Sequence, residues 1–173
     1  RGFDLVVYSN AIPASHEILK KAKSFKINCI KRGEILAKIC NEKKLIAITG
    51  SHGKTSTSSL IAFALSKLNM DINFILGGFY KDGSPSYNFS DSEWILAEID
   101  ESDGTIDLFY PHITLLLNID WDHCDHYKNF QKIKNTFYSV IRRTKFISFL
   151  NNKTFIEIEE LILKDKSKRP NYK

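Results

Sequence analysis

A short glycine-rich turn between a buried strand and a helix constrains the fold of this chain more than any other feature. The strand pattern at Leu45–Thr49 runs directly into residues 50–55 (Gly-Ser-His-Gly-Lys-Thr), and helical spacing then continues to about Leu68. Glycine permits a tight turn and lets backbone N–H groups approach phosphate oxygens closely. The first turn of the helix adds unpaired N–H donors and a partial positive charge. The arrangement therefore predicts a phosphate-binding loop.

The residue types in this loop predict how a nucleotide would be held. The Lys54 ammonium suits the β- and γ-phosphates, and the Thr55 hydroxyl suits Mg²⁺. The common loop has a glycine four positions before its Gly-Lys pair, where this chain has Ile48, so an ordinary GTPase or kinase pattern is excluded. The alternative is a glycine turn that leads into a capped helix, with Lys54 merely exposed. The predicted nucleotide-binding residues are Gly50, Ser51, His52, Gly53, Lys54, Thr55 and Ser56.

Strand and helix patterns alternate along the whole chain, which predicts an α/β fold with a parallel sheet covered by helices. The expected strands are residues 4–9, 27–30, 45–49, 72–76, 94–99, 113–118 and 145–149, and the expected helices are residues 15–24, 33–42, 54–68, 130–142 and 156–163. The first of these helices is expected to be capped by Ser15. A polar stretch at residues 41–44 predicts a boundary between domains at 1–42 and 43–173. The last ten residues, 164–173, have the composition of a loop.

The charges are distributed unevenly. The chain has a net charge of +5, yet ten acidic residues and no Lys or Arg lie between Asp91 and Tyr127. Concentrated oxygen ligands suit a hard cation such as Mg²⁺, and the alternative is a solvated acidic face. A uniformly basic surface would favour nucleic acid; this pattern does not, and we expect no nucleic-acid partner.

The three cysteines match no disulfide framework, which favours a cytoplasmic protein, and the apolar runs are too short for a membrane span.

A carboxylate follows the strand expected at residues 94–99. Ligands of open α/β sheets bind outside the carboxyl ends of the strands, so Glu98 is placed to meet a metal ion held by the phosphate loop. Acidic residues after strands are common, and Glu98 read alone is equally consistent with a surface carboxylate that binds nothing.

A histidine lies in the segment 118–127, which follows another buried strand. A neutral imidazole ligates divalent metals, and a neighbouring carboxylate fixes its tautomer. We therefore predict Thr55, Glu98 and His123 as metal ligands, and Lys54, Glu98 and His123 as the catalytic residues. A zinc site at His123, Cys124 and His126 is disfavoured because adjacent residues do not easily face one ion and no Cys-x-x-Cys pair is nearby. Without the phosphate loop, His123 would be read as a capping or core histidine.

Taken together and in this order, the motifs resemble the Mur ligase family of ATP-dependent amide-forming enzymes. The similarity extends over about residues 4–149 and is carried by residues 9–12, 27–40, 50–57, 77–78, 97–105 and 118–127. Ser51 replaces the usual threonine and keeps its hydroxyl. The resemblance implies the end of a Rossmann-like domain that binds a UDP-sugar, followed by the front half of a P-loop-type ATPase domain. Because the chain starts with Arg1 instead of Met, we expect it to be a fragment.

The resemblance also implies a reaction. ATP and Mg²⁺ would be the cofactors, and UDP-N-acetylmuramate and L-alanine the substrates, joined through an acyl phosphate in the synthesis of peptidoglycan precursors. Ser102 and Asp103 would face the sugar substrate. One alternative is a related ligase that recycles a murein tripeptide onto the same UDP-sugar; another is a nucleotide-binding module without catalysis. Folylpolyglutamate synthase shares the short loop but fits residues 100–103 poorly.

Overall fold

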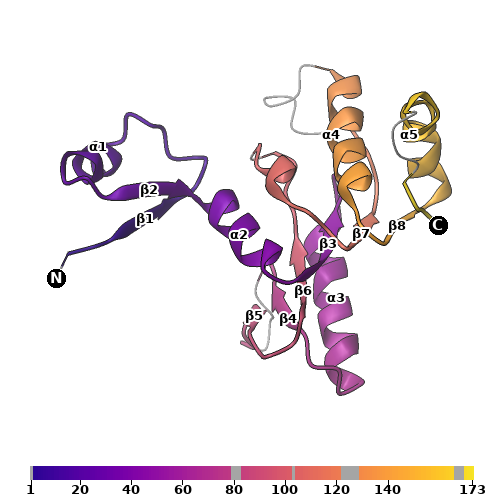
Figure 1. The fold of residues 1–173 in the computed structure, drawn as a ribbon, viewed down its shortest axis with the longest axis horizontal. Helices are drawn as coiled ribbons and strands as arrows, with labels where there is room; N and C mark the ends of the chain where they lie inside the picture. Colours follow the sequence, from indigo (N-terminus) through magenta and orange to yellow (C-terminus); the bar gives the residue numbers. More distant parts are fainter. Residues whose placement is uncertain (1, 79–82, 103, 122–128, 166–169) are drawn as a thin grey trace.

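A small two-stranded unit forms the N-terminal part of the computed structural model, which describes residues 2–78, 83–102, 104–121, 129–165 and 170–173. Strand β1 (Leu5–Tyr8) pairs in parallel with β2 (Asn28–Lys31), and helix α1 (Glu17–Ser24) connects them. In Figure 1 this unit lies to one side of the remaining chain, and helix α2 (Arg32–Asn41) leads from it into the larger sheet. A parallel pair requires such a crossover, so the local pattern and the topology agree.

The larger sheet has six strands in the order β5-β4-β6-β3-β7-β8. Their bounds are Lys44–Thr49 for β3, Asn73–Ile75 for β4, Tyr87–Asn88 for β5, Trp94–Glu98 for β6, Ile113–Leu116 for β7 and Ile147–Leu150 for β8. Every neighbouring pair is parallel except β4 with β5. The fold class is therefore α/β with a mostly parallel sheet, as the sequence predicts.

Helices cover both faces of this sheet and form two hydrophobic cores. The helices are α3 (Lys54–Lys67), α4 (Phe130–Arg143) and α5 (Asn152–Lys164), with a 3-10 helix, η1, at Ile106–Leu108. Alternate residues of β3 supply the two cores, because successive side chains of a strand point to opposite faces. Leu45 and Ala47 pack with α2, α4 and α5, whereas Ile48 packs with Ala62 of α3. β3 and the loop that follows it thus lie at the centre of the domain.

Helix α2 contacts both sheets. It touches β1 and β2, while its Ala37 and Cys40 lie in the core of the six-stranded sheet. Burial raises the pKa of the Cys40 thiol to about 12, so it stays protonated at neutral pH. The domain boundary at residues 42–43 stays a prediction.

Several details differ from the sequence prediction, among them the start of α5, which was expected at residue 156 and is at Asn152. Strand β5 and η1 were not expected, since both are too short to show a period. The side chain of His16, not Ser15, caps α1 by accepting a hydrogen bond from Ile18 N. Residues 171–173 pair with β8, so the last residues are not simply loop: Ser148 N donates to Asn171 O and Lys173 N to Ser148 O. An edge strand offers such unpaired backbone groups.

None of the helices within the described ranges has the length and apolar character needed to span a membrane.

Candidate nucleotide-binding site

The loop between β3 and α3 depends on two glycines in the left-handed region. Gly50 has a φ of 136° and Gly53 a φ of 82°, and Gly53 is the N-cap residue of α3. Residues with a Cβ rarely adopt these angles. At Gly50 an added Cβ would also lie only 3.0 Å from the carbonyl oxygen of Asn118. The glycine pattern that predicts the loop is therefore required by its observed geometry.

The side chain of Asn118, just beyond β7, holds the tip of the loop. His52 N donates to Asn118 Oδ1 at 2.8 Å, and Asn118 Nδ2 donates to His52 O at 3.0 Å. The backbone carbonyl of Asn118 also accepts from Ser51 N at 3.2 Å. The Ser51 hydroxyl accepts from Asp120 N at 3.0 Å. These hydrogen bonds fix the loop to the end of β7.

These bonds separate the N–H groups of the loop into two sets. Those of Ser51 and His52 donate within the protein. The first N–H bonded within α3 is that of Thr57, which donates to Gly53 O. A helix leaves its first N–H groups without intrahelical partners, so those of residues 53–56 are the donors available to phosphate. The sequence pattern did not make this distinction.

The ammonium of Lys54 lies inside the site and is not simply exposed. Lys54 Nζ donates to Gly50 O at 2.7 Å and to Glu101 Oε2 at 2.9 Å. The Lys54 side chain is 14% exposed and that of Glu101 is 3% exposed. Burial raises the pKa of Glu101, and the pairing with Lys54 opposes this rise without cancelling it. Sequence reasoning missed Glu101 as a partner of Lys54, although it lies in the acidic motif.

The predicted metal ligands Thr55 and Glu98 pack against consecutive glycines after β4. A Cβ added at Gly77 would lie 2.5 Å from Glu98 Cδ, and one added at Gly78 would lie 2.9 Å from Thr55 Cγ2. Glu98 Oε2 is buried and finds no hydrogen-bond partner within the described part of the chain. A buried carboxylate oxygen without a donor is unfavourable unless a cation satisfies it.

This donor set fits Mg²⁺. The ion prefers oxygen ligands and is usually held by one or two protein groups together with substrate phosphates. His123, the third predicted ligand, lies outside the described residues, as do the alternative zinc ligands Cys124 and His126. Among the residues whose positions are described, no three His, Cys, Asp or Glu side chains gather around one point.

The acidic stretch does not form one cluster over the ranges that the structure describes. Glu93 pairs with Lys44 at 2.6 Å, and Asp107 pairs with Arg143 at 3.0 Å. Glu98 and Glu101 instead lie at the carboxyl edge of the sheet, beside the phosphate loop. The solvated-face interpretation therefore suits Glu93 and Asp107. Glu101 pairs with Lys54, so of these four acids only Glu98 retains the metal interpretation.

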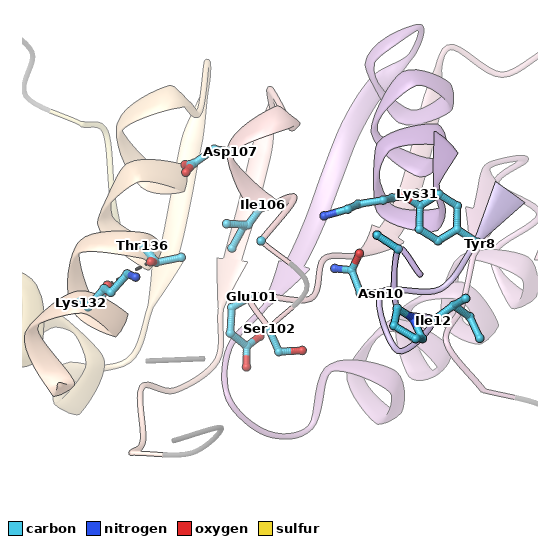
Figure 2. Close-up of a pocket in the computed structure, with 13 residues that line it drawn as sticks. Tyr8, Asn10, Ile12, Lys31, Glu101, Ser102, Ile106, Asp107, Lys132 and Thr136 are labelled. Atoms are coloured by element: carbon cyan, nitrogen blue, oxygen red, sulfur yellow. Dashed lines mark hydrogen bonds between the residues drawn. The ribbon is translucent and has the colours of Figure 1, made fainter. Parts of the chain in front are cut away.

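A cavity of about 550 Å³ opens next to Glu101, between the N-terminal unit and the large sheet. Figure 2 shows Tyr8, Asn10 and Lys31 on one side, with Lys132 on the other and Ser102 between them. Ser102, which the resemblance places near a sugar substrate, lines this cavity; Asp103 lies outside the described residues. Neither the cavity nor its basic residues were apparent from the sequence.

The fold and the loop together define a P-loop-type nucleotide-binding domain. Comparison with known proteins is consistent with this class, because residues 48–169 match the Mur ligase middle domain. The chain belongs to the Mur ligase family.

Individual relatives agree with this assignment. The chain is 42% identical over 140 residues to UDP-N-acetylmuramate–L-alanine ligase of Dictyoglomus turgidum, covering 81% of this chain and 30% of that protein. Among solved structures, a UDP-N-acetylmuramate:L-alanyl-γ-D-glutamyl-meso-diaminopimelate ligase from Neisseria meningitides has a TM-score of 0.84 at 19% identity, over 98% of this chain and 57% of that one. A UDP-N-acetylmuramate–alanine ligase from Thermotoga maritima has a TM-score of 0.77 at 22% identity, and the match covers 90% of this chain and 37% of that one. These two structures support the fold. The chain spans less than a third of the Dictyoglomus relative.

Proposed function

We propose that this chain is the nucleotide-binding part of an ATP-dependent ligase that adds L-alanine to UDP-N-acetylmuramate. The observation that carries the proposal is the glycine-rich loop at the carboxyl edge of the sheet, with Glu98 on the neighbouring strand. Glu98 Oε2 is buried and has no hydrogen-bond partner among the described residues. The choice of substrates rests on the name of the Dictyoglomus relative.

The loop residues have distinct roles in this proposal. The N–H groups of residues 53–56, which precede the first N–H bonded within α3, bind phosphate oxygens at the positive end of this helix. Lys54, held by Gly50 O and Glu101, places its charge where negative charge develops on the transferred phosphoryl group. A preorganised donor of this kind needs no rearrangement during the reaction. Ser51 and His52 keep the loop in shape through their bonds to Asn118 and Asp120.

Thr55 and Glu98 would hold Mg²⁺, with His123 as the predicted further ligand. When bound, Mg²⁺ supplies charge neutralisation between the phosphates and an incoming carboxylate. Glu98 serves this role well because its Oε2 is buried and has no hydrogen-bond partner in the part of the chain that the structure describes. Thr55 lies at the start of α3, so its hydroxyl lies at the same helix end as the phosphates.

The reaction needs positioning more than covalent help. A carboxylate oxygen of the lactyl group of UDP-N-acetylmuramate attacks the γ-phosphorus of ATP, and the bond to the bridging oxygen breaks to give an acyl phosphate and ADP. The amine of L-alanine then attacks the acyl carbon, and loss of phosphate and a proton gives the amide. We place the sugar nucleotide in the cavity between the two units, where Lys31 and Lys132 offer positive charge. In this arrangement residues 1–42 contribute to binding the UDP-sugar and residues 43–173 to binding ATP.

The test is phosphate release by the protein encoded by the complete reading frame that contains this chain. Release from ATP with Mg²⁺ and UDP-N-acetylmuramate should require L-alanine. A requirement for L-alanyl-γ-D-glutamyl-diaminopimelate would instead assign the tripeptide recycling reaction. If ATP binds but no acceptor supports release, the ligase proposal is wrong and a non-catalytic nucleotide-binding module remains.

A further inference from the structure

The glycine pair Gly77–Gly78 has no conformational reason to be glycine. Both residues follow β4, whose Ile75 is in register with Ala97 of β6, so the pair lies next to the end of β6. Neither residue is among the four described glycines with positive φ, which are Gly50, Gly53, Gly83 and Gly104. Alanine is therefore compatible with the backbone at these two positions.

The reason lies in the space that a side chain would occupy. At Gly77 an added Cβ would overlap the carboxyl group of Glu98, of which Oε1 is the nearest atom and Cδ would lie at 2.5 Å. At Gly78 it would lie 2.9 Å from the methyl carbon of Thr55. Real Cβ atoms essentially never make contacts this short. Each glycine thus leaves room for one of the two described candidate metal ligands.

We infer that Gly77 and Gly78 are positioning residues, whose missing side chains allow Glu98 and Thr55 to reach one cation from neighbouring positions. The inference rests on the proposed function, because it assigns Glu98 and Thr55 to the metal. It gives both glycines a steric role that is separate from that of the loop glycines Gly50 and Gly53.

Alanine at Gly77 should move the metal ligand and leave the fold intact. The atoms in the way belong to the end of a flexible side chain, so Glu98 can rotate aside without a backbone shift. Rotation would take the carboxylate away from its position beside Gly77. Changes that disturb the groups orienting a metal ligand typically weaken metal binding about 10- to 100-fold.

The experiment is a double-mutant cycle in the complete protein, with Mn²⁺ as the probe. Mn²⁺ binding in the presence of a non-hydrolysable ATP analogue is measured by electron paramagnetic resonance. Gly77→Ala should weaken Mn²⁺ binding by about tenfold or more. In a Glu98→Ala background the same change should have no further effect, because the displaced group is already absent.

A second cycle tests Gly78 through Thr55. Gly78→Ala should weaken Mn²⁺ binding less than Gly77→Ala, since only a methyl group must move. Thr55→Ser keeps the hydroxyl and removes that methyl group, so it should rescue Gly78→Ala. Gly2→Ala is the matched control, because no atom lies within 4 Å of its added Cβ.

The outcomes separate the inference from the proposed function. If Gly77→Ala and Glu98→Ala weaken Mn²⁺ binding additively, or if Gly77→Ala matches Gly2→Ala, the positioning role is wrong. If Glu98→Ala leaves Mn²⁺ binding unchanged, the metal assignment fails and the inference fails with it. Thermal unfolding without metal then still reports the steric contact. Gly77→Ala should lower Tm in the protein that retains Glu98, and it should not lower Tm in the Glu98→Ala background.

Discussion

The bonds between Asn118 and His52 provide the most direct test of how the phosphate loop is held. Asn118→Ala removes two hydrogen bonds, at 2.8 and 3.0 Å, that join the side chain to the peptide of His52. A typical hydrogen bond contributes about 1 kcal/mol net, so the loop should lose about 2 kcal/mol of local stability. Each 1.4 kcal/mol corresponds to a factor of ten in affinity. If nucleotide binding must restore the loop geometry, ATP affinity should fall by roughly 10- to 30-fold.

Asn151 provides a matched control for this change. It also makes two side-chain hydrogen bonds, accepting from Thr154 N at 2.9 Å and donating to Leu117 O at 2.8 Å. Asn151→Ala should therefore destabilise the protein by a similar amount, through loss of the α5 cap, without releasing the loop. Both variants are compared by calorimetric titration with an ATP analogue and by thermal unfolding. Equal losses of nucleotide affinity in the two variants would refute the reasoning.

Three further predictions concern the charged residues of the site. Lys54→Ala should lower kcat by at least about 10²–10³, the scale for removing one preorganised electrostatic donor, and near-normal turnover would contradict the assignment of the loop. Glu98→Ala should raise the Mg²⁺ concentration needed for activity, and an unchanged Mg²⁺ titration would exclude the metal role. Because burial raises the pKa of Glu101, the folded protein binds this proton more tightly than the unfolded chain does. The stability that depends on this proton is therefore fully present below the ordinary pKa and is lost as the pH rises through the raised value. Glu101→Gln should flatten this part of the stability profile. An unchanged slope of Tm against pH, measured from below the ordinary glutamate pKa of about 4.3 up to neutral pH, would disprove the prediction.

Much of the fold was predictable because its signals are local. Residues 45–55 contain a buried strand, two glycines and a helix start, and each depends on neighbours a few positions away. The alternation of strands and helices likewise indicated a parallel sheet. β5 and the pairing of residues 171–173 were missed, because a segment of two or three residues has no measurable period.

The sequence by itself determined the glycine-rich loop between β3 and α3, the α/β class and the family. Glycine positions and hydrophobic periods depend on residues that are close together in the sequence. Only the tertiary structure decided which partners complete the site. Asn118 lies 66 positions from His52, and Glu101 lies 47 positions from Lys54. Periodicity reports which face of an element is buried, but it does not report which strands become neighbours. The order β5-β4-β6-β3-β7-β8 brings the ends of β4, β6 and β7 around the loop, and with them the contacts on which the proposed chemistry depends.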